Sequence, residues 1–202
     1  MQQKLILPVN RTRVTASAFN RAYRERFGYP HYGTDLVSAV GDRTVYASGT
    51  GTLIIAGWDE YAGNTVVIRY PGAYLRSEDR YEDIIFRYFH LDSLARIPTG
   101  EGAITKDTVL GRYGGSGFGS MTRWSPHLHL EADTDVRYPR HSPTFGASGS
   151  VIFGRGAGAT ADSVRDALGY LYLKPTPPDS QTYQTDGKPY VDDRDLCVPE
   201  LL

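Results

Sequence analysis

The chain has 202 residues, of which 40% are hydrophobic, so it can bury the core of one domain of ordinary size. The formal net charge of -1 gives no electrostatic basis for binding nucleic acid, and no basic stripe is present. The only cysteine, Cys197, excludes an internal disulfide, and no apolar run approaches the ~20 residues that span a bilayer.

The lead-in, residues 1–30, reads as irregular and aromatic, with a short helix over residues 16–26. Its tyrosines are expected to pack against the domain surface, with a wall of a substrate groove as the alternative. The apolar part of residues 1–8 is too short for a signal peptide. Either the protein leaves the cell by another route, or a precursor segment is missing from this sequence.

His31 and Asp35 form the first polar pair of interest. Pro30 and Gly33 disfavour a helix here, and residues 36–40 read as a strand, so the pair is expected on a loop that enters a strand. A histidine nitrogen and an aspartate oxygen both ligate zinc. Taken alone, the pair is better explained as an Asp–His hydrogen bond on the surface.

A series of strands is expected next, spaced by about ten residues. The 22 Gly, 12 Pro and 15 Tyr suit short strands joined by tight turns. Charged residues between 73 and 83 predict an exposed hairpin tip, and His90 ends the strand that follows. The pattern predicts a mainly β fold with an antiparallel sandwich or barrel-like core. The expected strands are 44–47, 52–56, 65–70 and 83–91.

The glycine-rich loop at residues 114–120 leads into a strand and not into a helix, which disfavours a phosphate cradle and favours a flexible wall beside a cleft. On the strand that follows, His127 and His129 share one face because side chains alternate with period two. Two imidazoles are costly to bury unless their lone pairs are used. A catalytic metal ion would bind one of the two imidazoles and leave the other beside its open coordination position, where water binds. The alternative is a strand with two solvated histidines.

The segment after residue 140 is predicted to be an extension with little β structure. Residues 162–173 predict a helix capped by Thr160 or Asp162. Cys197 reads as a bystander near a flexible end. An acidic cluster reads as part of a solvated tail more readily than as a cation site, and it consists of Asp192, Asp193 and Asp195.

Taken in order, these motifs resemble the lysostaphin-type (LytM-like) zinc endopeptidases, a family of peptidoglycan hydrolases. The resemblance covers roughly residues 28–133, and its two histidine motifs in this order are specific. Residues 71–83 and 120–124 are longer than the family pattern, which would alter substrate choice. The resemblance is carried by residues 31–36, 56–58 with Tyr61 and 63–64, 88–91, 114–117 and 126–131.

The resemblance implies a division of the chain and a set of roles. Residues 1–27 would be a lead-in, 28–140 the zinc peptidase domain, and 141–202 an extension of unknown role, with minor helix in both extensions. His31, Asp35 and His129 would be the zinc ligands, and His90 and His127 the catalytic pair. Substrate-binding residues would be Tyr61, Asn64 and Trp124.

The activity implied is hydrolysis of peptide bonds in cell-wall peptidoglycan by a zinc-activated water, outside the cytoplasmic membrane. One catalytic histidine would take the proton of the water and the other would donate, in either allocation. A His-Glu-x-x-His motif is absent. The competing hypotheses are a non-catalytic relative that binds the wall or partner proteins, and a carbohydrate-binding β module. The second leaves the histidine spacing unexplained.

Overall fold

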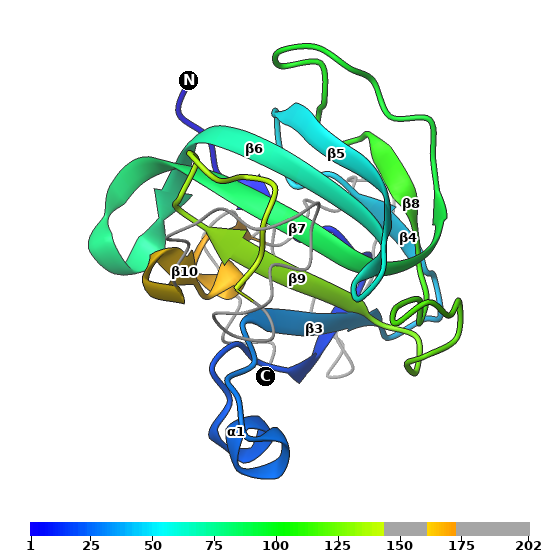
Figure 1. Ribbon diagram of the computed structural model, residues 1–202. Helices are drawn as coiled ribbons and strands as arrows, with labels where there is room; N and C mark the ends of the chain where they lie inside the picture. Colours follow the sequence, from blue (N-terminus) through cyan, green and yellow to red (C-terminus); the bar gives the residue numbers. More distant parts are fainter. Residues whose placement is uncertain (144–160, 173–202) are drawn as a thin grey trace, which may run out of the picture.

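The computed structural model describes residues 1–143 and 161–172, and its main element is a nine-stranded antiparallel sheet (Figure 1). The central path runs β2-β3-β9-β7-β6-β5, while β8 pairs with β7 and β4, and β10 pairs with β9. The prediction of a mainly β fold is confirmed. The elements are β1 Leu5–Ile6, β2 Thr12–Ala16, α1 Arg21–Phe27, β3 Gly33–Ser38, β4 Thr44–Tyr46, β5 Thr52–Asp59, β6 Gly63–Leu75, η1 Arg76–Glu78, β7 Arg80–Leu94, β8 Val109–Tyr113, β9 Leu128–Asp133, η2 Ala161–Ser163, β10 Val164–Arg165, η3 Ala167–Gly169 and β11 Leu171–Tyr172.

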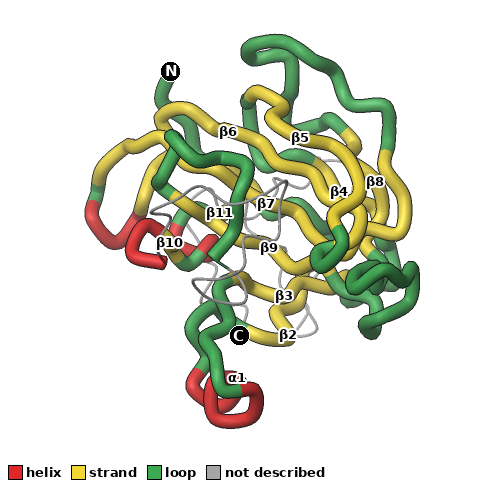
Figure 2. The backbone as a smooth tube through the Cα atoms, viewed as in Figure 1, coloured by secondary structure: helices red, strands yellow, loops and turns green. Residues whose placement is uncertain are grey.

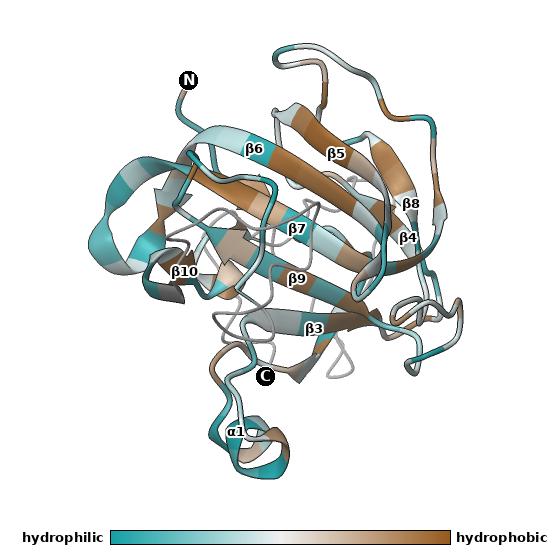
Figure 3. Ribbon diagram, viewed as in Figure 1, coloured by the Kyte–Doolittle hydropathy of each residue, from teal (hydrophilic) through white to brown (hydrophobic). Residues whose placement is uncertain are grey.

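The two faces of the sheet are used differently. On β7, Phe86 and Tyr88 point into the large apolar core, whereas Ile85, Arg87 and Phe89 point to the opposite face. Apolar stretches run along β5, β6 and β7 (Figure 3). The opposite face carries a second, smaller apolar cluster, and its buried members are Ile55, Ala62, Val67, Ile85 and Phe89.

The N-terminal segment is more regular than its sequence indicates. Leu5, Leu7 and Val9 belong to the large core, and β2 extends the sheet by pairing with β3. These strands have two to five residues, too few to reveal their periodicity in the sequence. The helix is α1, which stands apart from the sheet (Figure 2). It begins later than predicted because the Asn20 side chain caps it by accepting a hydrogen bond from the backbone N–H of Tyr23.

The prediction of a helix over residues 162–173 is wrong. Over residues 161–172 the chain forms the 3-10 turns η2 and η3 and the short strands β10 and β11. Pairing of β10 with β9 and of β11 with β1 uses the backbone groups that a helix would need. Asp166 starts a separate turn by accepting a hydrogen bond from the N–H of Leu168.

The exposed hairpin tip is also shorter than predicted. Strands β6 and β7 continue to Leu75 and from Arg80, so only four residues make the turn. Ala73 and Leu75 are buried, and this burial extends the pairing beyond the charged sequence. The acidic cluster of Asp192, Asp193 and Asp195, and Cys197, lie outside the described residues.

A cluster of buried hydroxyl groups lies within the large core. The hydroxyls of Tyr70 and Tyr88 are 2.7 Å apart, and the backbone N–H of Ser48 donates to Tyr70 Oη at 3.0 Å. The Ser48 hydroxyl is 3.1 Å from Tyr88 Oη. Each polar group is thereby satisfied without water. In the part of the chain that the structure describes, no helix is long and apolar enough to cross a bilayer.

Gly63→Ala is expected to destabilise the fold more than Gly41→Ala. Both glycines have a positive φ, +74° and +78°, a conformation that costs a residue with a side chain about 1–3 kcal/mol. A Cβ at Gly63 would in addition overlap Ser116, whereas a Cβ at Gly41 would meet nothing within 4 Å. Urea unfolding should therefore give a lower midpoint for Gly63→Ala, and equal midpoints would contradict the close packing against Ser116.

Candidate metal centre

The pairing of β3 with β9 brings three potential ligands together. Asp35 lies directly opposite His129 in the register, and His31 precedes β3 by two residues. The distance from Asp35 Oδ1 to His129 Nδ1 is 3.0 Å and to His31 Nε2 is 3.2 Å. His31 Nε2 and His129 Nδ1 are 3.2 Å apart. The structure thus gathers the three residues that the resemblance named as ligands.

Local contacts fix the orientation of His31 and His129. His31 Nδ1 lies 3.0 Å from the carbonyl oxygen of Ser17, which only accepts, so Nδ1 carries the proton and Nε2 keeps its lone pair. The ring of Tyr23 stacks on His31 with centroids 4.4 Å apart. The ring of Phe89 stacks on His129 at 5.6 Å. Residue 33 is glycine because a Cβ there would overlap the His129 ring.

The three ligand atoms fit a tetrahedral zinc ion. Metal–ligand distances of ~2.0–2.1 Å place the corners of a tetrahedron about 3.3 Å apart. The three measured separations of 3.0, 3.2 and 3.2 Å lie close to that edge. Two imidazole nitrogens and one carboxylate oxygen are also a donor set that zinc accepts. Three protein ligands leave one corner for water or substrate.

The charges of the cluster are strongly coupled. Burial alone would raise the pKa of Asp35, but hydrogen bonds from His129 and His31 outweigh it and lower that pKa well below its usual range. Burial alone would lower the pKa of His129. Its contacts with the carboxylates of Asp35 and Glu131 outweigh that effect and raise the pKa to about 9. The cluster therefore attracts positive charge.

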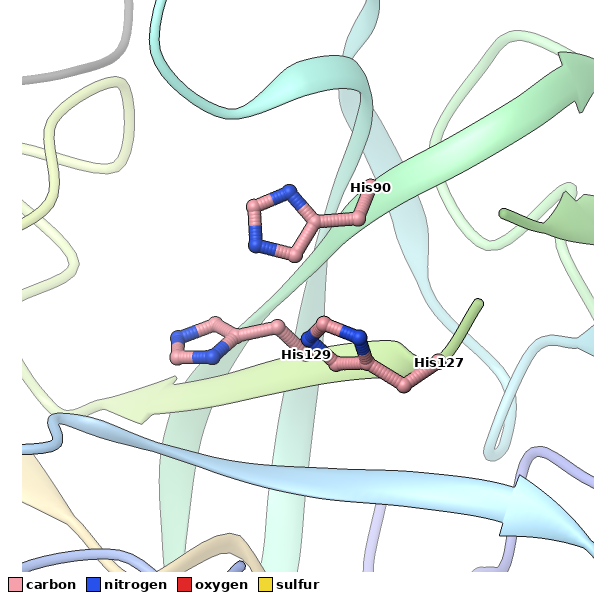
Figure 4. Close-up of side chains that lie close together, drawn as sticks. All are labelled: His90, His127 and His129. Carbon is pink, nitrogen blue, oxygen red and sulfur yellow. The ribbon is translucent and has the colours of Figure 1, made fainter. Parts of the chain in front are cut away.

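His90 and His127 complete a second convergent set with His129. One ligand atom from each of the three histidines lies within 4.8 Å of the other two. Figure 4 shows the His90 side chain coming from β7 toward the pair on and beside β9. The ring centroids of His90 and His127 are 5.1 Å apart, and those of His90 and His129 are 5.6 Å apart. The two sets share His129, so all five predicted residues meet at one place.

His90 sits at a β-bulge in a strained conformation. Its φ is +62°, and two residues of β7 oppose one residue of β6 at this point. His90 Nδ1 faces the carbonyl oxygens of Ser116 at 2.8 Å and Ala62 at 3.1 Å, so Nδ1 carries the proton. Burial, followed by the charges of His129 and His127, lowers the pKa of His90 to about 3. The ring is therefore neutral at pH 7, with its lone pair on Nε2.

His127 is arranged in the same way but is more accessible. Its Nδ1 faces the carbonyl oxygen of Ser125 at 2.6 Å, and its Nε2 lies 3.6 Å from Asp35 Oδ1. The side chain is 17% exposed. The glycine-rich loop fixes the backbone of both histidines, because Gly114 donates its N–H to the carbonyl of His90 and accepts from the N–H of His127.

The three residues predicted to bind substrate lie around His90. The ring of Trp124 is 5.9 Å from that of His90, and the ring of Tyr61 contacts Phe118 at 5.4 Å. Tyr61 is exposed. The side-chain amide of Asn64 donates to the carbonyl of Asp92 at 3.4 Å, and its backbone N–H donates to Ser116 Oγ at 3.0 Å. Tyr61 and Trp124 thus form part of a rim, whereas Asn64 ties β6 to the end of β7 and to the glycine-rich loop.

Sequence reasoning gave no role to Arg87 or Glu131, which are buried next to His129. The alternation of His129, Glu131 and Asp133 on one face of β9 was a usable signal, since three polar side chains on a buried face require partners. The partner, Arg87, lies on another strand and could not be identified by spacing along β9.

Comparisons with known proteins identify the family of this chain. Residues 29–139 match the model of peptidase family M23. The peptidoglycan DD-endopeptidase ShyC of Vibrio cholerae serotype O1 is 33% identical over 101 residues, which are 50% of this chain and 19% of that protein. The match therefore spans about a fifth of that relative's length.

Solved structures show the same fold. Lysostaphin from Staphylococcus simulans aligns with a TM-score of 0.51 and 17% identity, over 93% of this chain and 65% of that one. A structure of the SpoIIQ–SpoIIIAH pore forming complex aligns with a TM-score of 0.54 and 16% identity, over 85% and 92% of the two chains. The family model spans more than half of the 202 residues and includes all five residues that converge. The chain therefore belongs to peptidase family M23, the lysostaphin-type family that its motifs indicated.

Proposed function

We propose that this protein is a zinc-dependent metalloendopeptidase that hydrolyses peptide bonds in bacterial peptidoglycan. The observation that carries the proposal is the convergence of His31, Asp35 and His129 beside His90 and His127. Membership of peptidase family M23 and the likeness to a peptidoglycan endopeptidase support the reaction and the substrate class. Such a substrate places the action at the cell wall, outside the cytoplasmic membrane.

His31 Nε2, Asp35 Oδ1 and His129 Nδ1 would hold the zinc ion. A bound zinc supplies Lewis acidity, which brings the pKa of a water to ~7 and polarises a carbonyl. The two remaining imidazoles, His90 and His127, each keep Nδ1 on a backbone carbonyl and present Nε2. One accepts the proton of the attacking water. The other, protonated at Nε2, donates to the developing oxyanion or to the leaving amine.

The rim formed by Tyr61 and Trp124 supplies the substrate contacts in this proposal. Trp124 packs between His90 and Phe118 and therefore borders the catalytic pair directly. Tyr61 is 41% exposed and packs on the Phe118 ring that Trp124 contacts. Flat aromatic surfaces of this kind hold an extended peptide by apolar contact while leaving its amides free. Asn64 would act here mainly by holding the glycine-rich loop and the end of β7 in place.

Loss of a ligand should remove both zinc and hydrolysis. Asp35→Asn is expected to purify with less than a tenth of the zinc of the wild type, because a neutral amide replaces the anionic ligand. Asp42→Asn, a matched change at a half-buried carboxylate that accepts hydrogen bonds from Asn10 and Thr44 outside the ligand set, should retain zinc and activity. The measurements are metal analysis and mass spectrometry of fragments released from purified peptidoglycan.

The same assay distinguishes a hydrolytic enzyme from a non-catalytic relative, which is the competing hypothesis. Wild-type protein that binds zinc stoichiometrically yet releases no fragment from peptidoglycan would disprove the hydrolytic function. Equal release by the wild type and Asp35→Asn would show that the products do not come from this site.

His90→Gln and His127→Gln should separate catalysis from metal binding. Each is expected to retain about one zinc per chain, because neither residue belongs to the ligand set, and to lose roughly 10²–10⁴-fold in kcat through lost proton transfer. Kinetics on a soluble peptidoglycan fragment, together with metal analysis, give both quantities. Loss of zinc from either variant would show that the substituted histidine is a metal ligand.

Zinc binding should release about one proton per chain at pH 7. With a pKa raised to about 9, His129 is protonated in the metal-free protein below that pH and must lose a proton to offer Nδ1. Affinity should therefore fall as the pH falls below about 9, and above that pH His129 no longer contributes a proton to the release. Calorimetric titration in two buffers of different ionisation enthalpy measures the release, and heats independent of the buffer would contradict it.

A further inference from the structure

A buried charged network lies behind the candidate metal centre and has no part in the catalytic proposal so far. Arg87 and Glu131 are both 0% exposed and lie opposite each other in the pairing of β7 with β9. Arg87 Nη2 donates to Asp133 Oδ2 at 2.9 Å, and Arg87 Nη1 lies 3.6 Å from Glu131 Oε2. The Ser142 hydroxyl also donates to Glu131 Oε2.

This network is a poor choice for stability alone. Removing charges from water costs several kcal/mol per ion, and apolar side chains of similar size often serve a core as well or better. Ile85 and Phe89, which flank Arg87 on the same face of β7, are apolar. Within the part of the chain that the structure describes, Arg87 Nε and Nη1 are buried without a hydrogen-bond partner, so the ion pair leaves donors unsatisfied. Three charged side chains at this place therefore require another explanation.

The network lies next to the nitrogen of His129 that faces away from the ligand set. His129 Nε2 is buried, has no hydrogen-bond partner among the described residues, and lies 3.6 Å from Glu131 Oε1. His129 Nδ1 faces Asp35 and His31. When Nδ1 gives its lone pair to a metal, the ring proton must be on Nε2, and the Glu131 carboxylate is the acceptor beside it. The stacked ring of Phe89 restricts the tilt of His129.

We propose that Glu131, held by Arg87 and Ser142, is a positioning residue that keeps the proton of His129 on Nε2 and strengthens divalent-metal binding at Nδ1. This inference rests on the proposed function, because it concerns the same ligand set. Glu131 touches neither substrate nor the reacting atoms in this assignment. Its effect is on the affinity of the site and on the tautomer of one ligand.

The test uses Glu131→Gln, which keeps the shape of the side chain and removes its charge. Zinc affinity, measured by competition with a chromophoric chelator, is expected to fall 10–100-fold. Long-range ¹H–¹⁵N NMR of the zinc-loaded wild type should show His129 protonated at Nε2 and metal-bound at Nδ1. Ser142→Ala removes only the hydroxyl donor to Glu131 and should lower the zinc affinity several-fold. This variant replaces Glu131→Gln in the test if Glu131→Gln does not fold.

Tyr70→Phe is the matched control, since it removes a buried hydrogen-bonding group from the large core, away from the ligand set. Its unfolding midpoint in urea should fall while its zinc affinity stays within twofold of the wild type. Equal affinity in Glu131→Gln and the wild type would overturn the inference while leaving the proposed function intact. An equal loss of affinity in Tyr70→Phe would also overturn it, because general destabilisation would then explain the effect. Wild-type protein that binds no zinc would overturn both proposals.

Discussion

The register between β3 and β9 is the constraint on which the site depends. It places Asp35 opposite His129, and a slip of one residue would send every side chain of one strand to the other face. The register is held from the core side, where Leu36, Leu128 and Leu130 are fully buried. Hydrophobic burial on one face of the sheet therefore determines the geometry of the polar cluster on the other.

The remaining two histidines depend on a departure from regular sheet geometry. A regular strand would alternate Phe89 and His90 between the two faces. The bulge at His90, with its φ of +62°, re-aims this side chain toward the site while Phe89 still stacks on His129. Such a backbone conformation persists only where its surroundings enforce it. Here the carbonyls of Ser116 and Ala62 and the backbone N–H of Gly114 supply that enforcement.

The sequence revealed those parts of the molecule whose signals are local. Period-two alternation predicted that His127 and His129 share one face; His129 lies on β9 and His127 directly before it, and the order of the motifs indicated the family. Convergence of His31, Asp35 and His90 on this segment required the resemblance, because no spacing rule brings residues about 40 to 100 positions apart together. The short strands near both ends were missed since pairs such as Leu5 and Leu171 stabilise each other only after the fold has formed. Arg87 was missed for the same reason, as its partners lie on β9.

The described segments at the two ends are integral to this architecture. The family match ends at residue 139, yet two later segments contact the strand that carries His129. Ser142 donates to Glu131, and β10 pairs with the end of β9. Leu5 and Leu171 are fully buried in the same core as Leu128. Each buried aliphatic side chain of this size contributes about 1.5–3 kcal/mol, so the ends supply a considerable share of the burial that fixes the register. The metal centre therefore draws on residues well outside the five that define it, and its affinity is a property of the sheet and of the network behind it.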